Sequence, residues 1–248
     1  MPVWAKLYVS LVCAAGLTAM AGAFLDRPAW PHDLLRFCTY LLLSLVAATL
    51  KLRLPGLTGT MSIGFVIVLL GISELTIPET MFIACAGTVV QCVWRAKSRP
   101  APVQVLFSVS AVAVSLMLAY ECSHFVRAQL HADSIAIVLA VATGLYFMAN
   151  SLLVSGVLSL VRGERLYVIW QQCYLLAFPY YLLGGAVAGL MAASGRDLGW
   201  QPPLLILPVM GFAFLFYHLY LTRLEMLTDP ALQASSLQTV RVHSATAT

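Results

Sequence analysis

The sequence predicts an all-α protein: a polytopic helical bundle that spans a membrane. Hydrophobic residues make up 61% of the chain and charged residues 10%, and the mean hydropathy is +0.90. Soluble domains usually hold about 45 to 50% apolar residues, so most of this chain must be solvated by lipid. Charged residues also separate several uncharged stretches, most of which reach the roughly 20 residues that a helix needs to cross a bilayer.

Eight apolar segments follow one another along the chain. They cover residues 7–25, 37–50, 54–73, 80–94, 100–120, 134–161, 166–195 and 198–222. We therefore expect one multi-span membrane domain over residues 1–226, with six to eight spans. Residues 227–248 are polar and of low complexity, and we expect a disordered cytoplasmic tail there.

The basic residues predict the orientation. Cytoplasmic loops carry an excess of Lys and Arg, and placing both termini in the cytoplasm puts ten of the fourteen basic residues inside. Those ten are Lys6, Lys51, Arg53, Arg95, Lys97, Arg99, Arg162, Arg165, Arg223 and Arg241. A cleavable signal peptide is the alternative for the first segment, because small residues fill positions 19–23. Its removal would leave the later orientation unchanged.

Several classes of function are disfavoured. The net charge of +4 comes from basic residues scattered beside the spans, so topology explains it better than nucleic-acid binding. Six cysteines without CxxC spacing indicate neither a disulfide framework nor a zinc ribbon. HExxH, GxSxG and Walker A motifs are absent, and we expect no enzyme activity and no cofactor.

The third segment is interrupted by acids. Thr76, Pro78 and Glu79 fit a helix start with a capping box, which would place Glu74 and Glu79 at the tip of a short helical hairpin. Pro55, Gly56 and Gly59 weaken regular helix before it. A carboxylate at the bilayer centre costs about 2.5 to 3.5 kcal/mol, so full crossing, with both acids at the outer interface, is favoured over re-entry.

Polar residues inside the spans are candidates for ligand binding. Asn150 lies near the middle of the sixth segment, where its amide needs either a partner helix or a ligand. The seventh segment adds Gln172 and Tyr180 beside Pro179, which should kink the helix. Its Gly185 and Gly189 have the GxxxG spacing that lets another helix approach. Tight packing alone would also explain this segment.

A polar group ends the fifth segment. Glu121 and His124 have the ExxH spacing that puts a carboxylate and an imidazole on one helical face, and Tyr120 precedes them. A metal site needs three or four ligands, and a second ExxH element is missing, so these two are weak candidates and no metal is expected. The candidate ligand-binding residues are therefore Glu74, Glu79, Tyr120, Glu121, Asn150, Gln172 and Tyr180.

Four stretches carry a resemblance to a known family. They are "LPGLTGTMSIGFVIVLL" at 54–70, "RAKSRPAPVQVLFSVSAVAVSLMLAY" at 95–120, "MANSLLVSGVLSLVRGERL" at 148–166, and "YYLLGGAVAGLM" at 180–191 with "PLLILPVMGFAFLFYHLYLTRLE" at 203–225. In order and spacing they resemble the N-terminal multi-helix membrane domain that precedes HD-GYP and GGDEF signalling domains in bacteria. Ser108 stands where that pattern carries asparagine.

The resemblance implies a sensor-like input module in a bacterial inner membrane. In that family the last helix passes a signal, often an unknown one, to a cytoplasmic enzyme domain, and we expect that a small-molecule ligand could be the signal here. Only about twenty residues follow Glu225 here, so we expect signalling or assembly through a separate partner rather than a fused output domain. The chain is also similar, in size and apolar texture, to substrate-binding membrane subunits of energy-coupling-factor vitamin transporters. That likeness implies the alternative of a small-molecule binding or uptake subunit.

Overall fold

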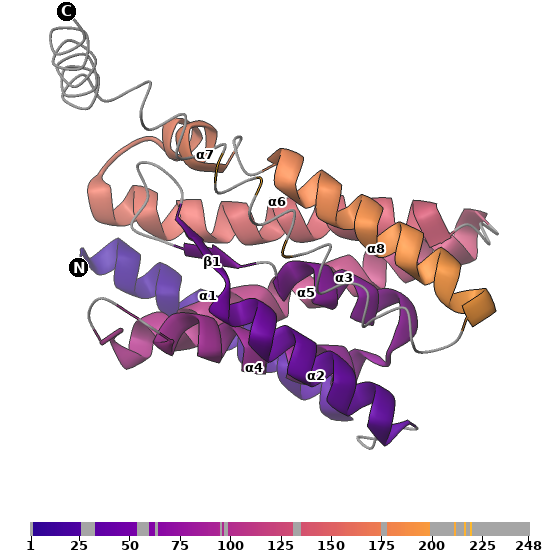
Figure 1. Cartoon of the computed structure of the whole chain (residues 1–248). Helices are drawn as coiled ribbons and strands as arrows, with labels where there is room; N and C mark the ends of the chain where they lie inside the picture. The colour runs from indigo at the N-terminus through magenta and orange to yellow at the C-terminus, as the bar shows by residue number, and fades with distance from the viewer. Residues whose placement is uncertain are drawn as a thin grey trace, which may run out of the picture.

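The computed structural model describes residues 2–25, 33–53, 60–62, 64–94, 96, 99–130, 135–174, 178–198, 211, 216 and 219. Over these residues the chain forms eight helices and one pair of short strands (Figure 1). In chain order they are α1 (Val3–Leu25), α2 (Leu34–Thr49), β1 (Lys51–Arg53), β2 (Thr60–Ser62), α3 (Gly64–Glu74), α4 (Ile77–Val93), α5 (Pro102–Leu130), α6 (Ile135–Arg162), α7 (Leu166–Tyr174) and α8 (Phe178–Leu198).

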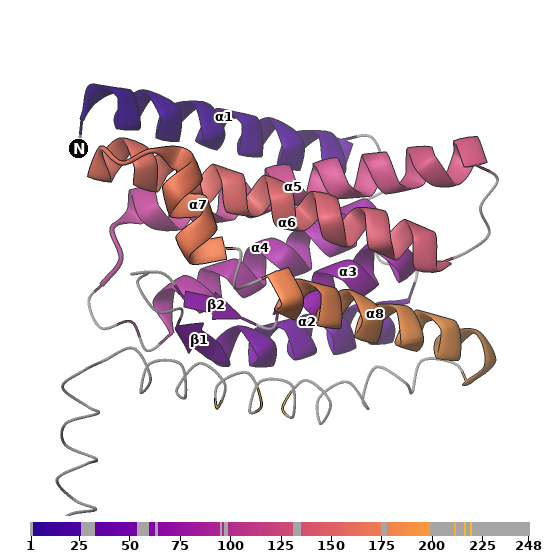
Figure 2. The same cartoon turned by 90° about the horizontal axis from the view of Figure 1, so that it is seen from above.

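Most of the helices run along one common axis, as expected for a helical bundle (Figure 2). Among the described residues, three helices, α1, α5 and α6, are long and apolar enough to cross a membrane. These three also pack against one another, and α7 is the helix that lies across the axis. The predicted helical bundle is therefore confirmed at the level of its helices and its long apolar segments.

Local sequence signals explain where the helices begin and end. The Asp33 side chain accepts a hydrogen bond from the backbone N–H of Arg36 at 3.0 Å and so caps α2. A glycine ends α6. Gly163 follows its last residue, Arg162, and has a φ of 72°, a left-handed conformation that glycine adopts easily. The Gly163 N–H donates to the Ser159 carbonyl at 2.8 Å, which satisfies one of the last carbonyls of α6.

The short helix α3 lies at the centre of the bundle. Residues 65–72 are all buried, because α2, α4, α6 and α8 pack around them. Figures 1 and 2 both show α3 enclosed by longer helices. A helix that is apolar on every side needs such an enclosure, either by protein or by lipid. Here the protein supplies it.

The segment before α3 differs from the prediction. We expected the third apolar segment to run from residue 54, whereas helix begins only at Gly64, and residues 51–53 and 60–62 form an antiparallel pair with Leu52 opposite Met61. As a helix, α3 is about 16 Å long, roughly half of the hydrocarbon core. The favoured full crossing would therefore require the β1–β2 segment to cover the remaining depth.

The predicted seventh segment, residues 166–195, is two helices rather than one kinked span. Helix α7 ends at Tyr174, and α8 begins at Phe178 with Pro179 in its first turn. Proline is well tolerated there but breaks a continuing helix. The predicted eighth segment lies outside the described residues except at positions 198, 211, 216 and 219, and the predicted tail at 227–248 lies wholly outside them.

Glycines on α8 let it pack closely against two other helices. A Cβ added to Gly185 would meet Thr143 Oγ1 of α6 at 2.6 Å, and one added to Gly184 would meet the Phe65 ring of α3 at 2.3 Å. At Gly189 the nearest such atom, on Leu139, is 3.8 Å away. The close approach predicted from the GxxxG spacing is confirmed at Gly185, and Gly184 extends it to α3.

Candidate functional site

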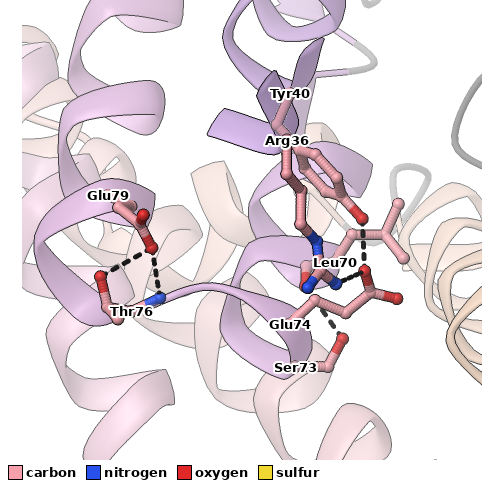
Figure 3. A network of polar contacts seen from close by, with 7 residues as sticks. All are labelled: Arg36, Tyr40, Leu70, Ser73, Glu74, Thr76 and Glu79. Atoms are coloured by element: carbon pink, nitrogen blue, oxygen red, sulfur yellow. Dashed lines mark hydrogen bonds and ion pairs between the residues drawn. The ribbon is translucent and has the colours of Figure 1, made fainter. Parts of the chain in front are cut away.

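The polar network at the end of α3 is built on Glu74 (Figure 3). One carboxylate oxygen, Oε2, accepts hydrogen bonds from the Tyr40 hydroxyl at 2.6 Å and from the Arg36 guanidinium, which also pairs with it ionically. The side chains of Arg36 and Glu74 are 34% and 17% exposed. Arg36 and Tyr40 are four residues apart on α2, so they present their polar groups on one face. The network therefore ties α2 to the last turn of the buried helix.

Glu79 caps the next helix, as the sequence predicts. Its Oε2 accepts from the backbone N–H and the hydroxyl of Thr76, both at 2.8 Å, and Figure 3 shows the two contacts. Glu79 itself is buried, and the Thr80 hydroxyl donates back to the Thr76 carbonyl at 2.9 Å. These contacts form the tight corner between α3 and α4. The carboxylate of Glu79 is thus engaged in local structure.

A small pocket opens beside this corner, between α3, α5 and α6. It is lined by Ile72, Ser73, His124, Arg127 and Val138, and its volume is about 20 Å³. A space of this size holds about one water molecule. Ser73 lies next to Glu74 in the chain, so the pocket adjoins the Glu74 network. Its hydroxyl donates to the Leu70 carbonyl at 2.9 Å.

The polar residues predicted at the end of the fifth segment lie in different environments in α5. Tyr120 is buried, and its ring lies 4.2 Å from the His124 ring, whereas Glu121 is exposed. Among the described residues, no three His, Cys, Asp or Glu side chains come together as metal ligands would. His131 and Asp133, which follow in the sequence, lie outside the described residues.

Asn150 lies in a different part of the bundle. Its side chain faces the hydroxyl of Tyr181 on α8, close enough for the two groups to interact. The Tyr181 ring in turn packs on Phe65 at 4.3 Å and on Phe147 at 4.9 Å. The partner helix that an amide needs in an apolar region is therefore α8, and aromatic rings of α3 and α6 surround the contact.

The structure brings some of the predicted site residues together and separates others. Glu74 and Glu79 lie at the end of α3 and the start of α4, and His124, in the second half of α5, lines the pocket beside them, with Tyr120 one turn before it. Asn150 is twelve residues from Val138 along α6, and therefore about 18 Å from the pocket. Gln172 and Tyr180 are in α7 and α8, but their side chains lie outside the described part of the structure.

Sequence reasoning missed the partners of Glu74. Arg36 is one of the four basic residues that the predicted orientation leaves outside, and Tyr40 was not singled out. The spacing of Arg36 and Tyr40 at i and i+4 was the available signal, yet nothing local to α2 indicates that α3 ends beside it. No family model matches this chain, and neither a curated protein nor a solved structure does so.

Proposed function

We propose that this chain is an integral membrane input module without a catalytic step of its own. It receives a signal at the end of the bundle that holds Glu74, and it hands a conformational change to a separate cytoplasmic partner. The apolar composition and the long apolar helices α1, α5 and α6 support membrane residence. The family resemblance supports the sensor-like role and a bacterial inner membrane.

The observation that carries the proposal is the position of α3. Its C-terminal end holds Glu74 in the network with Arg36 and Tyr40, and its N-terminal end begins two residues after β2. Between these ends the helix is buried on all sides. Closely packed helices move as units rather than deforming continuously. A change at Glu74 would therefore be transmitted along α3 to the β1–β2 pair.

The charges support a direction for this transmission. Lys6, Lys51, Arg53, Arg99 and Arg162 belong to the start of α1, the β1 strand, the start of α5 and the end of α6. These elements share the end of the bundle opposite Glu74 (Figure 2). By the preference of basic residues for the inside, we assign that end, and both chain termini, to the cytoplasm. The Glu74 network then faces outward, where an external signal arrives.

Hydrogen–deuterium exchange on the full chain in lipid nanodiscs tests the transmission. Glu74→Gln removes the negative charge and the ion pair with Arg36. We expect faster exchange in residues 60–74 and in β1, far from the substituted side chain. Glu121→Gln is the matched control, because it makes the same change on an exposed carboxylate at the same end. Faster exchange limited to residues 34–40 and 71–79 would contradict an input role.

A second experiment tests the orientation. In a cysteine-free background, Arg99→Cys places a single thiol three residues before the start of α5, and Glu121→Cys places one in the second half of the same helix. A membrane-impermeant thiol reagent applied to whole cells should modify the cysteine at position 121 and spare the one at position 99 until the cells are permeabilised. The reverse pattern would show that the end of the bundle with Glu74 faces the cytoplasm, and it would contradict the proposal that an external signal arrives there.

A further inference from the structure

The pocket beside the Glu74 network has a chemical character that the network itself lacks. Of its five lining residues, Arg127 is a permanent cation, and His124 offers a ring N–H. Ile72 and Val138 are apolar and buried. Arg127 is exposed to solvent on its outer side, which screens part of its charge, while the apolar walls lower the dielectric on the side of the pocket and strengthen its attraction for an anion there. The pocket thus suits a negative charge.

Among the side chains that the structure describes, no acid forms an ion pair with Arg127. Within the described part of the chain, the ion pair that forms joins Arg36 to Glu74, and Arg127 takes part in none. Glu79 is engaged by Thr76, and the Asp33 carboxylate accepts from the Arg36 N–H. Arg127 is also in the last turn of α5, where a cation is favoured by the helix dipole. The helix dipole explains why a cation is favoured at this position, but it does not supply a counter-ion for Arg127.

The size of the pocket limits its occupant. About 20 Å³ admits one water-sized centre, which excludes a nucleotide, a sugar or a peptide. Arg127 is exposed on its outer side, so an ion can enter from the surroundings. Ser73 Oγ lines the same space, and its hydroxyl can turn from the Leu70 carbonyl toward an anion. One compact charge therefore fits where a larger ligand does not.

We propose that this pocket binds a compact monovalent anion, with Arg127 as the counter-charge and His124 and Ser73 as hydrogen-bond donors. The occupant is a halide ion or the carboxylate head of a small organic acid. The inference rests on the proposed function and names the class of ligand for it. Because Ser73 and Glu74 share the last turn of α3, occupancy of the pocket acts on the helix that carries the signal.

Thermal unfolding of the purified full chain tests the proposal. The protein is held in an uncharged detergent at constant ionic strength, and isethionate, whose sulfonate head is larger than a carboxylate and too bulky for the pocket, is replaced stepwise by chloride or by acetate. We expect Tm to rise and saturate with chloride, with acetate or with both, since a ligand that binds only the folded state stabilises it. A response to acetate alone assigns a carboxylate, and a response to chloride alone assigns a halide.

Variants show whether the pocket carries the response. Arg127→Gln should abolish the rise in Tm, and Arg127→Lys should keep it with a midpoint at higher anion concentration. Arg162→Gln, the matched control at the last turn of α6, should respond as the wild type does. Val138→Phe fills the pocket without changing any charge, and it should also abolish the response. This variant keeps the test decisive if Arg127→Gln folds poorly.

Equal responses in the wild type and Arg127→Gln, or no difference between isethionate and the two small anions, would overturn the anion site. The exchange experiment on Glu74→Gln is run in isethionate and needs no pocket ligand. If that substitution reaches β1 while the anion titrations fail, the ligand class is wrong and the input role stands. If the anions bind but Glu74→Gln acts only locally, the site is real and the input role is wrong.

Discussion

Helices α1 and α3 are both almost wholly apolar, yet they occupy opposite environments. Residues 65–72 of α3 are all buried, whereas large side chains of α1 such as Trp4, Leu7 and Leu11 are exposed. Other helices enclose α3 on every side, while α4, α5 and α6 cover one side of α1. An apolar sequence therefore specifies that water is excluded, but it does not specify whether lipid or protein takes the place of water.

The two helices also differ in how they are held. Helix α3 relies on close packing and on the Glu74 network at its end. Helix α1 relies on a few contacts: a Cβ at Gly16 would meet Ser110 of α5 at 2.4 Å, and the Tyr8 hydroxyl donates to the Leu153 carbonyl of α6 at 3.1 Å. Substitutions in the two helices should therefore have unequal effects on stability.

The largest difference should come from truncating a leucine in each helix. Leu69 in α3 is 0% exposed and Leu11 in α1 is 65% exposed. Leu69→Ala leaves a cavity and should lower the free energy of unfolding by about 2 to 5 kcal/mol. Leu11→Ala should lower it by less than about 1 kcal/mol in the same detergent, because its neighbours are solvent molecules that rearrange. Denaturant unfolding measures the free energy of unfolding of both variants. Equal losses would contradict the difference between the environments of α3 and α1.

The next largest effect on stability should come from adding a methyl group at a glycine in each region. The Cβ of Gly184→Ala would lie 2.3 Å from the Phe65 ring, so α8 and α3 must separate or the ring must turn. Overpacking of this kind costs about 1 to 3 kcal/mol. In α1, Gly22 has no atom within 4 Å of the corresponding position. Gly22→Ala should therefore be neutral or stabilising, since alanine favours helix. Melting temperatures of the two variants give the comparison directly.

The Glu74 network should give an effect of similar or smaller size. Glu74→Gln leaves Arg36 without its ion pair, and we expect a loss of about 1 to 3 kcal/mol, reduced by the partial exposure of both side chains. A double-mutant cycle with Arg36→Gln isolates the contact from other effects of each change. A coupling energy near zero would show that α3 is held by packing alone.

The smallest effect should come from the hydrogen bond that ties α1 to α6. Tyr8→Phe removes the donor to the Leu153 carbonyl and should cost about 0.5 to 1.5 kcal/mol. Tyr167→Phe is the control, because Tyr167 is exposed and its hydroxyl accepts from Gln171 within the same helix. Thermal unfolding of the two variants should separate them. A Tyr8→Phe loss as large as that of Leu69→Ala would mean that α1 is an integral part of the core.

The features that sequence predicted correctly are those set by near neighbours in the chain. The capping box of Thr76 and Glu79 depends on residues three apart, and the close approach at Gly185 follows from the absence of a side chain. Asn150 was expected to find either a partner helix or a ligand, and α8 supplies a partner. Apolar runs located the helices, because their length and composition follow from the requirement to bury backbone polar groups.

The features that sequence could not predict depend on contacts between distant segments. Glu74 and Arg36 are 38 residues apart, and no pattern in α2 shows that α3 ends beside it. The antiparallel pairing of residues 51–53 with 60–62 was missed, because three-residue strands leave too short an alternation to recognise. The break between α7 and α8 was expected only as a kink, since Pro179 is compatible with either outcome.

The shortness of α3 has a consequence for biogenesis. Eleven residues are too few for a translocon to release as an independent spanning helix, and the adjoining strand backbone would leave peptide groups unsatisfied in contact with acyl chains. In a bilayer, α3 and the strands before it would therefore have to insert after the flanking helices, and their insertion would complete the bundle. The carboxylate of Glu74, at the end of α3, would then be among the last groups to find its partner during biosynthesis.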